Sequence, residues 1–75
     1  MQISLNCLQP GKRAVVKEIL TDPWLIARLR DLGLVPGTQI DCCYRSPGGQ
    51  VTALGFRGTV VALRTEDLKQ IQVRL

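Results

Sequence analysis

The sequence predicts a mainly β fold: a small, partly open β-barrel of about five strands, with one short α-helix inserted after the first strand. Three observations carry this prediction. The chain has 75 residues, which allows a single domain over residues 1–75. Glycine and proline pairs separate short runs rich in β-branched residues. Strands this short must curl to cover their apolar face, and closure also hides the sheet edges.

Five segments carry the strand signal, and turn residues bound each of them. In the first segment Ala14 and Val16 share one face, whereas Ile19 falls on the other. This mismatch predicts a β-bulge near Lys17 and Glu18. The expected strands are residues 12–20, 39–45, 50–56, 59–64 and 71–74.

A helix is expected between the first two strands because both of its ends are marked. Asp22 is a good N-cap, and Pro23 suits the first helical position. Gly33 fits the position just past the helix, where a left-handed residue closes it. Pro36-Gly37 then predicts a turn into the next strand.

Two single helical turns are expected outside this helix, at residues 4–8 and 65–69. Leu5 and Leu8 lie three residues apart and so share one side of the first turn. Thr65 is the expected cap of the second turn.

Positions on the helix and strands indicate which side chains form the core. Leu25, Leu29 and Leu32 recur at i, i+4 and i+7, and this stripe is expected to face inward. Phe56 is also expected in the core. In strand 39–45, alternation places Ile40, Cys42 and Tyr44 on one face, expected to be buried, and Asp41, Cys43 and Arg45 on the other.

The three cysteines indicate a reducing compartment. An odd count argues against a closed disulfide framework. Cys42 is expected in the core and Cys43 near the surface as a free thiol. No signal-peptide pattern is present, so we expect a cytoplasmic protein. No apolar run approaches the ~20 residues that span a bilayer.

The residue types argue against an enzyme. The chain has no histidine, so it lacks the usual base for a serine or cysteine nucleophile. Its glycine pairs lack the lysine and helix of a phosphate-binding loop. No cysteine spacing typical of a metal site is present. From these three observations we predict no catalytic residue, no cofactor and no metal ligand. The net charge is +4, but the basic residues are scattered, which favours a solvated surface over a polyanion site.

Several short motifs occur together in one order along nearly the whole chain. The central motif is Gly33-Leu34-x-Pro36-Gly37 after a leucine-bearing helix. The others are Leu5-x-x-Leu8-x-x-Gly11, Ala14-x-Val16-x-x-Ile19, Pro47 with Gly49, Ala62-Leu63-Arg64, Leu68, and Ile71-x-Val73. In this order the chain resembles FeoA, the small cytosolic protein of bacterial ferrous iron transport.

The resemblance implies an SH3-like β-barrel with a helical insertion, similar also to the C-terminal domain of DtxR-type metal-dependent repressors. It implies no enzymatic activity. It further implies a partner, the membrane ferrous iron transporter FeoB, whose cytosolic part includes a GTPase domain. The implied function is a cytosolic accessory protein that binds FeoB, modulates it, and is recruited by it to the inner face of the membrane.

Trp24 and Arg28 lie one helical turn apart and form the best candidate docking patch, together with Asp31 on the outer side of the helix. The alternative for Trp24 is that it covers the edge of the barrel. Two alternative functions also remain open: a nucleic-acid-binding SH3-like module, because the chain is basic, and a metal-sensing domain related to the repressors. The surface that binds the partner and the oligomeric state are not predicted.

Overall fold

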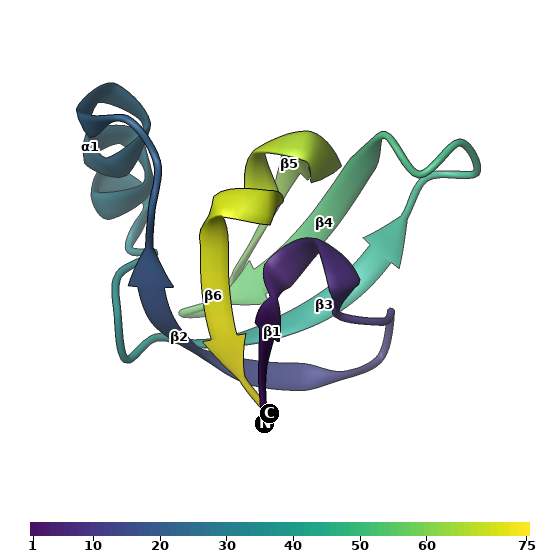
Figure 1. Cartoon of the computed structure of the whole chain (residues 1–75). Coiled ribbons are helices and arrows are strands. Elements are labelled where there is room, and N and C mark those ends of the chain that lie inside the picture. The colour runs from purple at the N-terminus through teal and green to yellow at the C-terminus, as the bar shows by residue number, and fades with distance from the viewer.

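Six strands form one antiparallel sheet in a computed structural model that describes residues 1–75 (Figure 1). The strand order is β1-β6-β2-β3-β4-β5. The strands are β1 (Gln2–Ser4), β2 (Arg13–Ile19), β3 (Gln39–Arg45), β4 (Val51–Phe56), β5 (Thr59–Arg64) and β6 (Ile71–Arg74). The helix α1 (Pro23–Leu32) joins β2 to β3, and the 3-10 helices η1 (Leu5–Cys7) and η2 (Thr65–Gln70) follow β1 and β5. The mainly β prediction is confirmed, and the curled sheet stays open between β1 and β5.

The sixth strand, β1, is absent from the sequence prediction, so α1 follows the second strand rather than the first. β1 has only three residues, and it pairs with β6 from the other end of the chain, where Ile3 lies opposite Val73. The N–H of Leu75 also donates to the carbonyl of Met1 at 2.9 Å, and the two termini meet in Figure 1. A strand made by such distant pairing leaves no local pattern to read.

The predicted ends of α1 are confirmed. The carboxylate of Asp22 accepts a hydrogen bond from the N–H of Leu25 at 2.9 Å, and Pro23 is the first helical residue. At the other end Gly33 has φ of 97°, and its N–H donates to the Arg30 carbonyl. The N–H of Leu34 donates to the Leu29 carbonyl at 2.8 Å, which completes the turn that closes the helix.

Both short helical turns form, but the second is not capped as predicted. η1 covers three of the five residues expected in the first turn. η2 begins at Thr65, whose Oγ1 lies 2.7 Å from Oγ1 of Thr52 and makes no cap bond. Thr65 therefore ties the start of η2 to β4 across the sheet.

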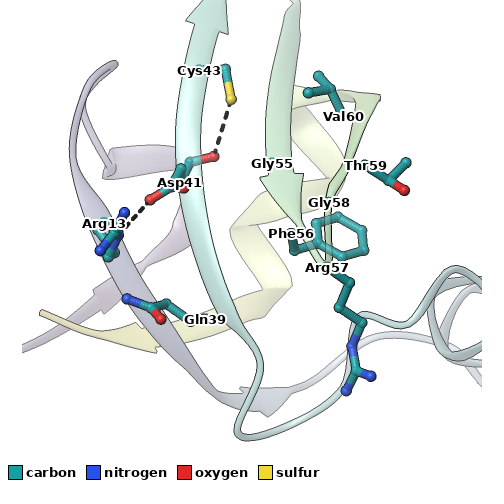
Figure 2. A pocket seen from close by; sticks show the side chains of 10 residues that line it. All are labelled: Arg13, Gln39, Asp41, Cys43, Gly55, Phe56, Arg57, Gly58, Thr59 and Val60. Carbon is teal, nitrogen blue, oxygen red and sulfur yellow. Dashed lines mark hydrogen bonds and ion pairs between the residues drawn. The ribbon is translucent and has the colours of Figure 1, made fainter.

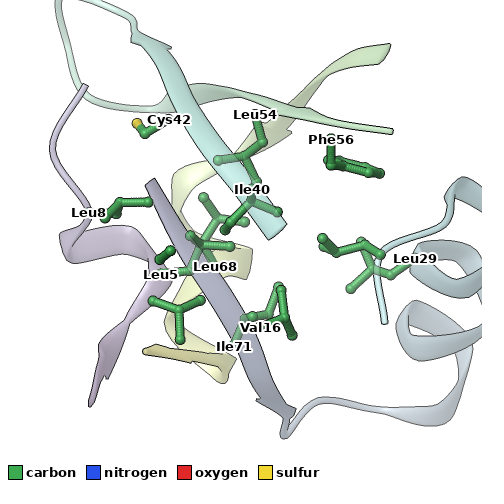
Figure 3. Close-up of a cluster of buried hydrophobic side chains, with 13 residues drawn as sticks. Leu5, Leu8, Val16, Leu29, Ile40, Cys42, Leu54, Phe56, Leu68 and Ile71 are labelled. Carbon is green, nitrogen blue, oxygen red and sulfur yellow. The ribbon is translucent and has the colours of Figure 1, made fainter. Parts of the chain in front are cut away.

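The core lies on the concave side of the sheet (Figure 3). The predicted apolar stripe of α1 divides: Leu29 is buried, Leu25 is half-buried, and Leu32 is 43% exposed. The expectation for Leu32 was wrong because Leu34, after the left-handed Gly33, turns back and fills the core at this end of the helix. The buried residues are Leu5, Leu8, Ala14, Val16, Leu29, Leu34, Ile40, Cys42, Leu54, Phe56, Leu68, Ile71 and Val73.

One predicted bulge and one unpredicted bulge shape the sheet. The pairing of β2 with β6 shifts between Val16 and Glu18, which confirms the first. The pairing of β3 with β4 shifts between Cys42 and Tyr44, which reverses the faces of the residues that follow. Tyr44 is therefore 57% exposed rather than buried. Arg45 turns inward instead, where its guanidinium donates to the Leu8 carbonyl at 3.0 Å.

Candidate protein-docking surface

Trp24, Arg28 and Asp31, which we call the α1 patch, are all exposed on α1. Trp24 is 68% exposed, so most of its side chain is open to water. The guanidinium carbon of Arg28 lies 5.3 Å from the centre of the Trp24 ring, as expected for positions four residues apart on a helix. The structure thus brings Trp24 and Arg28 into contact, and it leaves Asp31 without an ion pair.

The chemistry of the α1 patch suits binding rather than reaction. A cation over an indole face at an exposed site contributes about 0.5–1 kcal/mol, which favours the position of Arg28 over the ring by a few-fold. Tryptophan and arginine are also the side chains most enriched among residues that dominate protein interfaces. The patch therefore presents a large apolar surface with a positive charge beside it.

A groove, which we call the α1–β5 groove, runs beside this patch. Its volume is about 500 Å³. Trp24 and Arg28 contribute to the helical wall, and Ala62 and Arg64 belong to the opposite wall, on the outermost strand of the sheet. The complete lining is Asp22, Trp24, Leu25, Arg28, Ala62, Leu63, Arg64 and Asp67. Sequence reasoning missed this groove because no local pattern places α1 beside β5.

A second hollow, the outer cleft, lies on the convex side of the sheet and has a volume of about 380 Å³ (Figure 2). The Nε of Arg13 donates to the carboxylate of Asp41 at 2.7 Å, and this hydrogen bond raises the pKa of the arginine. Gly55 opens the floor, since a Cβ there would lie only 3.0 Å from Sγ of Cys43. The thiol of Cys43 is exposed as expected.

Cys42 is buried, as the sequence predicted. Burial raises the pKa of its thiol, and the positive charge of Arg45 opposes that rise. The fold assembles no group of three or more histidine, cysteine or acidic side chains in a metal-binding arrangement. None of the helices has the length and hydropathy needed to cross a membrane.

Comparison with known proteins relates the whole chain to one family. The FeoA domain family matches residues 3–75. The solution structure of FeoA from Chlorobium tepidum is 29% identical with a TM-score of 0.93, and the match covers 97% of this chain and 70% of that one. For the FeoA-like protein from Clostridium acetobutylicum the identity is 30%, the TM-score 0.88, and the coverage 99% and 86%. No curated protein matches.

The same fold occurs inside larger metal-dependent repressors. The crystal structure of IdeR from T. acidophilum has a TM-score of 0.87 and 19% identity, and the match covers 99% of this chain but 34% of that protein. At this identity the similarity shows a shared fold alone. It confirms the structural likeness to the repressors that the sequence motifs indicated.

Proposed function

The chain belongs to the FeoA family, which is associated with ferrous iron transport, and on this premise we propose that it binds the cytosolic part of a FeoB-type transporter and modulates it. FeoA domains are small accessory domains without catalysis of their own. In this proposal the chain works in the cytoplasm and reaches the membrane through its partner. Binding is then the whole of its action.

The observation that carries the proposal is the exposure of Trp24 beneath the guanidinium of Arg28. The core does not use this ring, although it is the only tryptophan of the chain. Contact with a partner would bury it and release its apolar surface from water, at about 25 cal/mol per Å². Asp31 adds an unpaired negative charge on the same helix, available to a basic group of the partner.

Modulation would follow from unequal affinity for two states of the transporter. A ligand shifts a conformational equilibrium only by the difference between its affinities for the two states. The chain would therefore bind the nucleotide-bound and nucleotide-free forms of the cytosolic part with different strength. The form bound more tightly becomes the more populated one.

Calorimetric titration of the chain into the purified cytosolic part of the transporter, with and without guanine nucleotide, tests this function. We expect Trp24→Ala to weaken binding by about thirtyfold, as for a residue that dominates an interface. Tyr44→Ala is the matched control, because it truncates another exposed aromatic ring away from α1. Absence of binding by the unmodified chain in both nucleotide states, or equal losses in the two variants, would overturn the proposal.

A further inference from the structure

The strand β5 ends the sheet and presents an unpaired backbone edge. It pairs with β4 alone, through a regular antiparallel register in which Ala53 lies opposite Ala62. Just past the strand, the N–H of Thr65 donates to the Gln50 carbonyl at 2.9 Å, so these two residues form a hydrogen-bonded pair. Every second pair along the ladder from there is hydrogen-bonded as well. By alternation, the N–H and C=O groups of Val60, Ala62 and Arg64 point away from β4. β5 pairs with no strand other than β4, so these three N–H groups and the carbonyls of Val60 and Ala62 have no ladder partner. The carbonyl of Arg64 is already used, because Arg64 is the N-cap of η2.

A row of alternating donors and acceptors along an extended strand is complementary to another extended backbone. Adding a strand to an exposed edge is an established way for a protein to bind a peptide. The other edge of the sheet, β1, has three residues, whereas β5 has six. β5 is thus the edge with room for several successive hydrogen bonds.

The α1–β5 groove lies along this edge and indicates which side chains an added strand would carry. Val61 and Leu63 point to the concave side and pack against the core. An added strand would place alternate side chains beside them, facing Leu25 and Trp24 on the helical wall. Apolar residues at every second position fit this wall.

The charges of the groove and of the whole chain indicate which residues suit the remaining positions of an added strand. The only ion pair of the molecule joins Arg13 and Asp41, so Arg28 and Arg64 in the groove have no acidic partner. The groove also holds two acids: Asp22 is engaged as the cap of α1, and Asp67 makes no ion pair, so the formal charges of the groove itself balance. The chain carries a net charge of +4, which disfavours a second copy as the occupant and favours an acidic segment.

We propose that the free edge of β5 binds an extended segment of a protein partner, in which apolar and acidic residues alternate, as a seventh strand of the sheet. Trp24 and Arg28 then cover this segment from the helix. The identity of the partner rests on the proposed function, whereas the mode of binding rests on the edge itself.

Residue-resolved amide hydrogen exchange tests this mode with two probes. One is a short synthetic peptide of alternating valine and glutamate, and the other is the cytosolic part of the transporter. In the free chain we expect fast exchange at Val60, Ala62 and Arg64, and slow exchange at Val61 and Leu63, which are bonded to β4. A bound strand slows exchange at the first three.

Two substitutions at Ala62 separate the contribution of the backbone N–H to peptide binding from that of the side chain. Ala62→Pro removes an outward N–H that β4 does not use, so the sheet keeps its ladder. We expect it to weaken peptide binding about tenfold. Ala62→Val keeps the N–H and should change the affinity by no more than about twofold. The exchange pattern of the unmodified chain decides the question even if Ala62→Pro fails to fold.

The outcomes distinguish this inference from the proposed function. Slower exchange at Val60, Ala62 and Arg64 with either probe supports the β5 edge. Transporter binding that protects α1, when neither the transporter nor the peptide slows those amides, overturns the inference and keeps the function. Protection by the peptide without any transporter binding overturns the function and keeps the inference. If neither probe slows these amides, β5 is not a docking edge.

Discussion

The inward and outward sides of α1 differ sharply in how they are used. On the inward side only Leu29 is fully buried, and Leu34 follows it into the core just past the helix. On the outward side Trp24 is 68% exposed and stacks only with Arg28. In Figure 1 the helix stands away from the sheet. The difference teaches that few buried side chains attach α1 to the core and that most of its surface remains available to a partner.

The energies on the two sides follow from this arrangement. Burying a leucine side chain contributes about 1.5–3 kcal/mol to folding, so Leu29 provides much of the attachment of α1. The apolar area of Trp24 contributes little to folding because water still reaches it. The predictions that follow test this division of roles, from the largest effect to the smallest.

Truncation of the buried anchor is expected to have the largest effect. Leu29→Ala should lower the free energy of unfolding by about 2–5 kcal/mol, because it leaves a cavity between α1 and the sheet. Leu32→Ala on the same helix should cost about 1 kcal/mol or less, since that side chain is already half in water. Urea unfolding followed by circular dichroism measures both. Equal losses of unfolding free energy would show that the two sides of α1 contribute equally to the stability of the fold.

The N-cap of α1 is expected to contribute less to the free energy of unfolding than the buried Leu29 side chain. Asp22→Ala removes the acceptor for the N–H of Leu25 and should cost about 1 kcal/mol. Asp22→Asn keeps an acceptor oxygen and should retain most of the stability. If both substitutions cost the same in urea unfolding, the cap bond is not what stabilises the start of α1.

Truncation on the outward side should barely change folding. Trp24→Ala removes the contact with Arg28, which at an exposed site is worth about 0.5–1 kcal/mol. Thermal unfolding of this variant next to Leu29→Ala makes the comparison direct. A loss for Trp24→Ala as large as that for Leu29→Ala would mean that the ring stabilises the fold rather than serving a partner.

The neighbouring thiols of Cys42 and Cys43 should differ in how they affect the pH dependence of stability. Burial raises the pKa of the Cys42 thiol above its ordinary value of 9.0, so the folded chain keeps a proton that the unfolded chain loses first. This contribution to stability is complete below the ordinary value and is lost as the pH rises through the raised one. Urea unfolding at increasing pH should therefore show a decline that Cys42→Ala reduces and Cys43→Ala leaves in place. A decline unchanged in Cys42→Ala would contradict this account.

Much of the fold was predictable, and the failures have physical causes. The caps of α1, the bulge near Lys17 and the turns depend on residues close in sequence, and all of them appear in the structure. β1 was missed because its pairing partner lies at the other end of the chain. The face of Tyr44 was wrong because a bulge inserts one residue into β3, and strand alternation cannot reveal that insertion.

The candidate site was predictable only in part. The spacing of Trp24 and Arg28 placed them on one side of a helix, and the structure shows them in contact. Their exposure, the groove beside them and the free edge of β5 depend on where α1 sits relative to the last strand of the sheet. Sequence patterns describe each element but not the distance between two of them.

The sequence by itself determined where α1 begins and ends, which segments become most of the strands, and that the chain resembles FeoA. These properties follow from caps, turns and periodicity, which act over a few residues. Only the tertiary structure decided that Leu29 rather than Leu32 anchors the helix, that Arg45 rather than Tyr44 turns inward, and that β5 keeps an open edge. Each of those outcomes depends on pairing and packing between distant parts of the chain, where a shift of one residue reverses the face that a side chain occupies.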